Sequence, residues 1–533
     1  MRLHFFILLL LTGFLIHAQQ INPNPWVMAI DSTAPITYRN PVIPGFYSDP
    51  SICRVGEDYY LITSTFEFFP GIPVFHSKDL INWNQIGHVI HRREQFPNGL
   101  NIFAATLRYH QGTYYMITTT VMGEGNFYMT ATNPAGPWSD PIFIDVEAID
   151  PDLFFDEDGK VYVISSTFDL AQIDLSTGQL VTEKRKVWHG TGGRYPEGPH
   201  IYKKDGYYYL MASEGGTEEA HQVTISRSNN IWGPYISNPA NPILFHANIA
   251  GMDKAIHGVG HADLVQAHDG SWWITFHGYR SVTGYPVHHT IGRETCMAPV
   301  SWPIGGWPEV NGNGTISVDM RVPTLPQVPI APKPTTINFE EPLGLEWNYI
   351  QIPEQKNYEL NTKKGTLSLI GSDLTIRPIG EKRSPTFVGR RLTDLGFESI
   401  TRLSFDPKNK NEEAGMILYN NGSHFDIIVT TDGDRRYLQV KLMFGQNTYR
   451  SNEIHLKPGY VDLKISGTGQ EFTFAYAQEG QEFQVVDRAD ARFMSSETLG
   501  WFTGVYVGLY ATGNGQQSKA KATYEWFEYR SMD

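Results

Sequence analysis

The sequence predicts an all-β protein, in which a five-bladed β-propeller is followed by a β-sandwich of the jelly-roll type. Three observations carry this prediction: a hairpin pattern repeated along the first 300 residues, a change to apolar-polar alternation near residue 337, and weak helical periodicity throughout. The 533 residues exceed what a single hydrophobic core usually organises, so two domains are expected. A content of 13% aromatic residues, with 50 glycines and 33 prolines, suits many short strands joined by tight turns.

Residues 1–18 are predicted to form a signal peptide. Arg2 gives a short basic start, an apolar stretch runs from Phe5 to Ile16, and Ala18 is a small residue at the expected cleavage site. The apolar stretch is shorter than the roughly 20 residues that a membrane helix needs. We therefore expect an exported protein, periplasmic or extracellular, with no membrane as partner.

Five copies of a hairpin pattern predict the propeller, which we place at residues 19–325. In each copy a turn with glycine leads into an aromatic-rich strand, and the copies read GEDYYLI from Gly56, QGTYYMI around Gly112, DGKVYVI around Gly159, DGYYYLM around Gly206 and DGSWWIT around Gly270. Glycine tolerates the positive φ that tight hairpin turns require. Antiparallel units repeated at this period indicate a propeller or an array of modules, and five copies fit five blades.

Corresponding positions in the five copies carry residues suited to catalysis. Nine residues before the turn glycine stand Phe103, Asp150, Glu197 and His261, and seven residues before the first turn stands Asp49. The strand that enters each turn is expected to be the inner one, so these positions should converge on the propeller axis. An isolated Asp before Pro is usually a turn residue. Three carboxylates in one concave site, however, are tolerable only if at least one keeps its proton or has a pKa split from those of the others.

A paired acid and base of this kind is what glycoside hydrolysis needs. One carboxylic acid protonates the leaving oxygen, while a carboxylate on the other side of the sugar activates water, at a separation of ~6.5–9.5 Å in inverting enzymes. A carbohydrate-binding propeller without catalysis is the remote alternative, because it would not need three carboxylates at matching positions.

A proline-rich stretch marks the domain boundary. The segment RVPTLPQVPIAPKPTT lies between Arg321 and Thr336, and we take residues 326–336 as the linker. Beyond it, TLSLIG, AGMILYN, HFDIIVT and YLQVKLMF alternate apolar and polar residues, which predicts a half-buried antiparallel sheet and a β-sandwich over residues 337–533.

Several long motifs resemble glycoside hydrolase family 43, and especially its β-xylosidase and α-L-arabinofuranosidase members. The motifs are NPVIPGFYSDPSICRVGEDYYLITSTFEFFPGIPVFHSKDLINW, AIDPDLFFDEDGKVYV, YPEGPHIYKKDGYYYLMASEGGT, GVGHADLV and IGRETCMAPVSWPIGGWPEV. The resemblance implies that Asp49 is the general base, Asp150 the residue that tunes the acid's pKa, and Glu197 the general acid, with inversion at the anomeric carbon. It also implies that the second domain is concanavalin A-like.

The resemblance extends to further site residues. Arg293 in GRET corresponds to an arginine of the substrate pocket, and Phe502 in GWFTGVYVG is the candidate for an aromatic lent by the second domain. His261 in GHADLV corresponds to a central histidine near a water or a calcium ion. We expect no required cofactor, with a structural calcium ion reached through water and a hydrogen-bonded structural histidine as equal alternatives at His261.

Other residues are candidates from their chemistry alone. Phe46, Phe69 and Phe103 are candidates for apolar walls, because sugar faces stack on aromatic rings, although each suits core packing equally well. Arg194 and Glu214 flank the strand of Glu197, where they orient it or pair on the surface.

Charge and cysteine content narrow the function class. The formal charge of −14, without a run of Lys or Arg, argues against nucleic acid as partner, whereas xylan or arabinoxylan oligosaccharides raise no such objection. We expect an exo-acting enzyme that releases terminal pentose. The C-terminal domain favours β-1,4-xylosidase, and α-L-arabinofuranosidase or a dual activity is the alternative. Cys53 and Cys296 are expected as free buried thiols, with a single bridge as the alternative.

Overall fold

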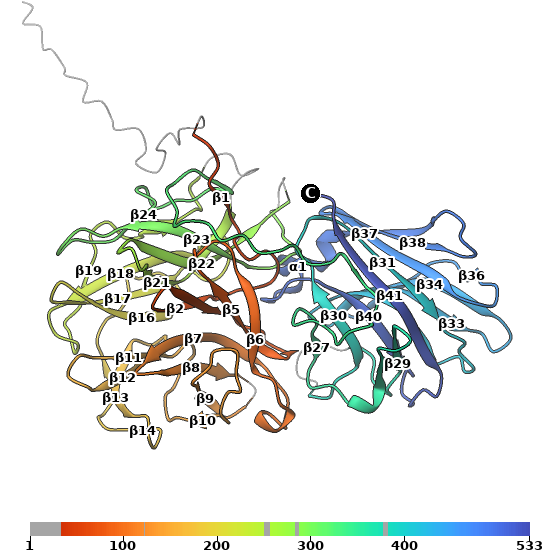
Figure 1. Ribbon diagram of the computed structural model, residues 1–533, viewed down its shortest axis with the longest axis horizontal. Coiled ribbons are helices and arrows are strands. Elements are labelled where there is room, and N and C mark those ends of the chain that lie inside the picture. The colour runs from red at the N-terminus through yellow and green to blue at the C-terminus, as the bar shows by residue number, and fades with distance from the viewer. Residues whose placement is uncertain (1–33, 122, 250–255, 283–286, 377–381) are drawn as a thin grey trace, which may run out of the picture.

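The computed structural model describes residues 34–121, 123–249, 256–282, 287–376 and 382–533, so the predicted signal peptide lies outside the described residues. The described chain forms two β domains, a propeller coloured red to green and a sandwich coloured teal to blue (Figure 1). Its helical segments are short turns such as α1 (Ser496–Leu499). None of the described helices has the length and apolar character needed to cross a membrane.

Five antiparallel sheets form the blades of the propeller, as predicted. The first blade contains β2 (Ser51–Val55), β3 (Asp58–Ile62), β5 (Gly71–Ser77) and β6 (Asn84–Ile90), and the second contains β7 (Ile102–His110), β8 (Thr113–Thr120), β9 (Gly125–Ala131) and β10 (Ile142–Phe143). The third contains β11 (Asp152–Phe155), β12 (Val161–Ile164), β13 (Asp169–Asp174), β14 (Gln179–Leu180) and β15 (Arg185–Lys186), and the fourth contains β16 (Glu197–Lys204), β17 (Tyr207–Glu214), β18 (Gln222–Ser228), β19 (Ile236–Ser237) and β20 (Leu244–Phe245). The fifth contains β21 (Ile256–Gln266), β22 (Trp272–Arg280), β23 (Glu294–Ser301) and β24 (Glu309–Val310). The predicted turn glycines all have positive φ.

The first strand of each blade is the inner one. Strands β2, β7, β11, β16 and β21 contact one another in a closed ring around the axis. The two ends of the propeller chain are tied together, since β1 (Tyr38–Arg39) pairs with β25 (Asp319–Met320). Asn40 reinforces this closure by bonding both backbone groups of Met297 in the fifth blade. The residues that begin the inner strands are therefore brought to one end of the axis.

The second domain is a sandwich of two antiparallel sheets. One contains β26 (Thr336–Ile337), β28 (Tyr358–Asn361), β29 (Thr366–Ile370), β41 (Lys521–Ser531), β31 (Gly396–Ser404), β37 (Val461–Thr468), β38 (Glu471–Ala477) and β39 (Gln484–Asp490). The other contains β30 (Thr386–Arg391), β40 (Tyr506–Thr512), β32 (Glu413–Asn420), β33 (Ser423–Thr431), β34 (Arg436–Phe444), β35 (Asn447–Arg450) and β36 (Ile454–His455).

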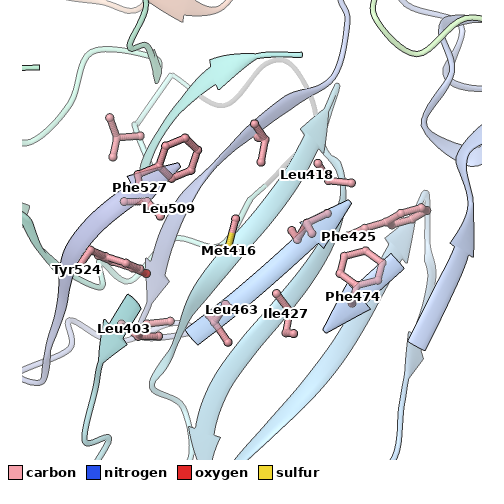
Figure 2. Packing of buried hydrophobic residues seen from close by; sticks show 14 of the residues in the cluster. Leu403, Met416, Leu418, Phe425, Ile427, Leu463, Phe474, Leu509, Tyr524 and Phe527 are labelled. Carbon is pink, nitrogen blue, oxygen red and sulfur yellow. The ribbon is translucent and has the colours of Figure 1, made fainter. Parts of the chain in front are cut away.

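Alternation along these strands builds the core of the sandwich. In β31 every second residue is buried, and Leu403 from this strand belongs to the same buried cluster as Met416 and Leu463 between the sheets (Figure 2). Aromatic side chains such as Phe474 and Tyr524 fill the same layer. The alternation that predicted a half-buried sheet is thus explained by one face packing on the partner sheet.

The two domains share an interface beside the propeller axis. Strand β27 (Tyr349–Ile350) pairs with β4 (Phe68–Phe69), which lies between β3 and β5 in the chain and forms a separate two-stranded sheet with it. The Phe68 ring stacks on Tyr506 of the sandwich, with ring centres 3.8 Å apart. Arg391 donates to the carbonyl of Phe46 at 2.6 Å. The sandwich is therefore packed against the rim of the propeller by both backbone pairing and buried aromatic contacts.

Both cysteines are free and buried, as the first of the two alternatives expects.

Candidate active site

The five corresponding blade positions meet in one cavity. Asp49, Phe103, Asp150, Glu197 and His261 all line it, and the cavity encloses about 360 Å³ including its open mouth. The remaining lining residues are Phe66, Ala104, Ile149, Thr217, Arg293 and Phe502. The positions that the turn glycines align in sequence are therefore brought together in space.

The backbone around these residues is irregular. Asp49, Asp150 and His261 adopt left-handed φ values of 55°, 56° and 48°. Such a conformation costs non-glycine residues roughly 1–3 kcal/mol and is concentrated at functional sites. The inner strands also shift register next to Glu197 and on both sides of Gly260. These bulges re-aim side chains that a regular strand would point between the blades.

Asp49 is held as a carboxylate. Arg293 donates from Nη1 to Asp49 Oδ1 at 2.7 Å and from Nη2 to Oδ2 at 3.4 Å. Ser48 and Ser64 both donate to Oδ2. Burial opposes the ionisation of Asp49, but Arg293, His261 and His277 outweigh it and hold the pKa of Asp49 well below its usual range. An ionised, oriented carboxylate is the form that a general base requires.

Asp150, Glu197 and His261 form a coupled group beside Asp49. Burial and the neighbouring carboxylates raise the pKa of Asp150 to about 7. Burial lowers the pKa of His261, but the carboxylates raise it to about 9, so the ring is an imidazolium at neutral pH. Burial raises the pKa of Glu197, but hydrogen bonds from His221 and His261 and the charges of these rings outweigh it and hold that pKa well below its usual range.

His261 sits between the two expected catalytic carboxylates. Its Nδ1 is 3.7 Å from Asp49 Oδ1 and 3.5 Å from Glu197 Oε1, so these oxygens are at most about 7 Å apart. Two carboxylates flank a glycosidic bond at separations of ~5–9.5 Å. Asp49 and Glu197 can therefore act on the same sugar.

Two buried histidines that the sequence analysis missed connect the same carboxylates. His277 Nδ1 is 2.9 Å from Asp49 Oδ1, and its Nε2 is 3.2 Å from His221 Nδ1. His221 Nε2 is 3.0 Å from Glu197 Oε1. A signal for His277 was present, since it pairs with Gly260 across the last hairpin and so lies beside His261. His221 comes from the segment between β17 and β18, which the turn pattern does not register.

Aromatic rings line one side of the cavity, although two of the predicted ones do not. Phe103 is half-buried and its ring lies 5.0 Å from that of Phe66, a lining residue that the sequence analysis also missed. The prediction that Phe46 and Phe69 line the pocket is wrong. Phe46 is fully buried behind Phe66, and Phe69 is buried in the β4–β27 pairing with Tyr349, because the sandwich covers this part of the propeller.

The second domain contributes Phe502 to the cavity, as the resemblance implies. The Phe502 ring stacks on Phe66 with centres 6.0 Å apart, and its carbonyl accepts from Arg293 Nη2 at 3.4 Å. The segment is anchored on the propeller, since Glu497 Oε1 lies 2.6 Å from His289 Nδ1. The cavity is therefore completed only when both domains are in place.

Arg194 and Glu214, the two residues that flank the strand of Glu197, make contacts that suit a structural role. Arg194 pairs with Glu218 at the surface. Glu214 is buried and accepts hydrogen bonds from the backbone N–H groups of Thr191 and Gly193, at 2.7 and 2.6 Å. It thereby fastens the loop that precedes Glu197.

The cavity also contains a group of potential metal ligands. Ligand atoms of Asp150, Glu197 and His261 lie within 4.8 Å of one another. Calcium takes six to eight oxygen ligands, whereas this group offers two carboxylates and one histidine ring. An ion held here would therefore need further ligands, such as water.

Comparisons with known proteins cover both domains. A model of the glycosyl hydrolases family 43 matches residues 38–308, and a model of the beta xylosidase C-terminal concanavalin A-like domain matches residues 336–530. The chain is 41% identical to a non-reducing end α-L-arabinofuranosidase of Bacteroides ovatus, over 95% of this chain and 97% of that protein. It is 35% identical to a xylosidase/arabinosidase of Butyrivibrio fibrisolvens, over 92% and 98%.

Solved structures of family 43 proteins superpose on both domains. The Bacteroides ovatus protein Xyloglucan PUL GH43B superposes with a TM-score of 0.88 at 40% identity, over 93% of this chain and 100% of that one. A xylan β-1,4-xylosidase of Bacillus halodurans superposes with a TM-score of 0.85 at 32% identity, over 93% and 100%. The chain therefore belongs to glycoside hydrolase family 43, as a glycosidase with a five-bladed propeller and a concanavalin A-like C-terminal domain.

Proposed function

We propose that this glycosidase removes single pentose units from the non-reducing ends of xylan- or arabinoxylan-derived oligosaccharides, with inversion, and that β-1,4-xylosidase is its main activity. The observation that carries the proposal is the cavity itself. Asp49 and Glu197 face each other across His261, and Phe502 of the second domain closes the side formed by Phe66. A pocket closed in this way suits one terminal sugar, whereas an endo-acting enzyme needs an open cleft.

The residues supply each step of a single displacement. Asp49, kept anionic by Arg293, takes a proton from the attacking water, while Glu197 gives its proton to the leaving oxygen. Asp150 faces Glu197 from the neighbouring blade, and its charge opposes early ionisation of the acid. Phe66 and Phe103 offer apolar surface to the sugar.

A second candidate activity is α-L-arabinofuranosidase, alone or together with xylosidase. It is favoured by the 41% identity to the Bacteroides ovatus arabinofuranosidase over nearly the full length of both chains. Kinetics on 4-nitrophenyl β-D-xyloside and α-L-arabinofuranoside, followed by xylobiose and arabinoxylan, decide between them. Proton NMR of the first-formed product tests inversion, and a retained anomer would refute it.

Export of the enzyme is part of the proposal and rests on the N-terminal sequence. Cleavage after Ala18 would leave Gln19 as the first residue. N-terminal sequencing of the exported protein tests this, and an intact Met1 would contradict it.

The dependence of kcat/KM on pH should be bell-shaped with a basic limb near pH 7. The acidic limb reports protonation of Asp49, whose lowered pKa places this limb below the usual range of a carboxyl group. As pH rises, the Asp150–Glu197 pair loses its shared proton, and the pKa of about 7 for Asp150 places that loss near neutrality. Activity that stays constant up to pH 9 would contradict this description of the pair.

Replacing Phe103 by Ala is expected to raise KM by roughly five- to thirtyfold, which corresponds to about 1–2 kcal/mol of lost contact with the sugar. Initial-rate kinetics on the preferred aryl glycoside measure this. Phe155→Ala is the matched control, because Phe155 ends the inner strand of the third blade, away from the cavity. An unchanged KM in Phe103→Ala would remove this ring from the sugar site.

Removal of divalent metal ions is expected to leave activity unchanged. We propose that the enzyme needs no metal cofactor, since a protonated His261 supplies the positive charge between the carboxylates. Dialysis against a chelator, with metal analysis before and after, measures this. A loss of activity that calcium restores would favour the calcium alternative instead.

A further inference from the structure

Tyr195 presents an exposed aromatic ring close to the catalytic cavity that the proposed reaction does not use. The residue is 68% exposed, more than any other Phe, Tyr or Trp in the described part of the chain. A single exposed ring is common on protein surfaces and indicates nothing by itself. The backbone conformation of Tyr195, its neighbours and its place in the fourth blade give it a meaning.

The backbone holds Tyr195 in a fixed relation to the expected acid. Tyr195 stands two residues before Glu197 and has a left-handed φ of 50°, as Asp49 and Asp150 do. This conformation is unfavourable for a bulky side chain, and such strain is concentrated at functional sites. The intervening Pro196 has a φ fixed by its own ring, which stiffens the link. Two residues span at most about 7 Å, so the tyrosine stays close to the acid.

The neighbours of Tyr195 fix the orientation of its ring. The guanidinium of Arg194 lies 5.6 Å from the ring centre, a distance at which a cation is attracted to an aromatic face. Arg194 is itself anchored, since its Nε donates to the carbonyl of Gly215 at 2.7 Å and its guanidinium pairs with Glu218. Gly216 packs beside the ring, where a Cβ would come within 3.3 Å of it.

These contacts place the ring at the mouth of the cavity. Gly216 directly precedes Thr217, which lines the cavity and accepts a hydrogen bond from Arg293 at 3.0 Å. Tyr195 directly precedes the inner strand β16, which begins at Glu197. Because the inner strands begin at the catalytic end of the axis, a residue before β16 lies beyond the cavity, on the side of the solvent.

The order of the blades shows which part of a substrate would reach this ring. The inner strands form a closed ring of five, in which the fourth blade lies across from the junction of the first and second. The aromatic wall stands at that junction, with Phe66 from the first blade, Phe103 from the second and Phe502 stacked on Phe66. A terminal sugar therefore lies between this wall and Glu197. The group that leaves with the oxygen protonated by Glu197 then extends along the fourth blade, past Tyr195.

We propose that Tyr195 forms the leaving-group subsite and stacks on the first sugar of the leaving group, a β-1,4-linked xylopyranose. The hydroxyls of this sugar are equatorial, so its two faces expose C–H groups that suit an aromatic ring. Arg194 and Glu218 beside the ring offer N–H donors and carboxylate acceptors to the hydroxyls of the same sugar. This inference rests on the proposed function and deepens it, because it names the residue that recognises the part of the substrate beyond the cleaved bond.

The test compares two substrates that share the terminal sugar and differ in the leaving group. Tyr195→Ala is expected to lower kcat/KM on xylobiose by about tenfold. Methyl β-D-xyloside needs the same acid but has no second sugar, so its slow hydrolysis should be nearly unchanged. Tyr195→Phe keeps the ring and should retain the wild-type value on xylobiose. Aryl glycosides do not serve here, because their own ring would stack on the tyrosine.

Two controls separate the subsite from other effects. Inhibition by free xylose, which occupies the place of the terminal sugar, should be the same in Tyr195→Ala and the wild type. Tyr449→Ala removes an exposed tyrosine of the sandwich, which donates to Asp487, and should leave both substrates unaffected. Tyr195→Asn is the second ring-free variant, because asparagine tolerates the left-handed backbone and so keeps the test valid if the alanine variant unfolds at a lower temperature.

Equal losses on xylobiose and methyl β-D-xyloside, or unchanged xylobiose kinetics in a folded ring-free variant, would overturn the proposal. A wild-type enzyme that cleaves neither β-xyloside would instead refute the xylosidase activity. The same comparison is then made with an α-L-arabinofuranosyl xylobiose and methyl α-L-arabinofuranoside. A loss confined to the oligosaccharide would still support a subsite at Tyr195, and equal losses or none would again overturn it.

Discussion

Replacing Glu197 by Gln is expected to lower kcat on xylobiose or another unactivated oligosaccharide by about 10²–10⁴-fold, the usual contribution of a general acid. Glutamine keeps the size of the side chain but has no proton to give to the leaving oxygen. An aryl glycoside with a good leaving group departs with little protonation, so its kcat should fall much less. Steady-state kinetics on both substrates measure the difference.

The control for this substitution is Glu157→Gln, which makes the same chemical change at an exposed residue of the third blade. Its kinetics should match those of the wild type. Equal losses on both substrates in Glu197→Gln, with an unchanged unfolding temperature, would rule out Glu197 as the general acid. Asp150 would then be the next candidate for this role.

Replacing Asp49 by Asn is expected to lower kcat by a similar factor, about 10²–10⁴, but on all substrates alike. Activation of water is required whichever group leaves, so a good leaving group cannot compensate for a missing base. The contrast between equal losses here and unequal losses in Glu197→Gln distinguishes base from acid within one set of measurements.

The Asp49 variant needs a stability control, because Arg293 is buried and loses its charged partner. Removing one member of a buried ion pair is commonly destabilising. Thermal unfolding of Asp49→Asn should therefore be measured beside Asp58→Asn, a half-buried carboxyl that pairs with Lys78. A folded Asp49→Asn enzyme that loses activity only on unactivated substrates would contradict the base assignment.

The sequence predicted the architecture because the signals involved are local. A turn glycine and the strand that follows it define one hairpin, and counting back from Gly159 or Gly206 reaches Asp150 or Glu197 whatever the rest of the chain does. The same holds for the sandwich, because the alternation of apolar and polar residues along a strand such as β31 predicts that one of its faces is buried. Counting across the last hairpin from its turn would also have placed His277 opposite His261, and a bulge then shifts its partner to Gly260 in the structure.

The aromatic residues show where this reasoning stops. Phe46, Phe69 and Phe103 are equivalent as sequence signals, since each is an aromatic near a catalytic motif. The docked sandwich then buries Phe46 and Phe69 through β27 and Arg391, and leaves Phe103 at the cavity. Phe66 takes the place predicted for Phe46, with Phe502 stacked on it.

The sequence by itself determined that the chain is a five-bladed propeller with a sandwich behind it, and that Asp49, Asp150 and Glu197 share one end of the axis. Only the tertiary structure decided the protonation of these carboxylates and the walls around them. The physical reason is the separation along the sequence over which each signal acts. Hairpin pairing and alternation depend only on residues that are close together in the chain. The charge state of Asp49, in contrast, depends on Arg293 and His277, which lie more than 200 residues away in sequence and within 3 Å in space.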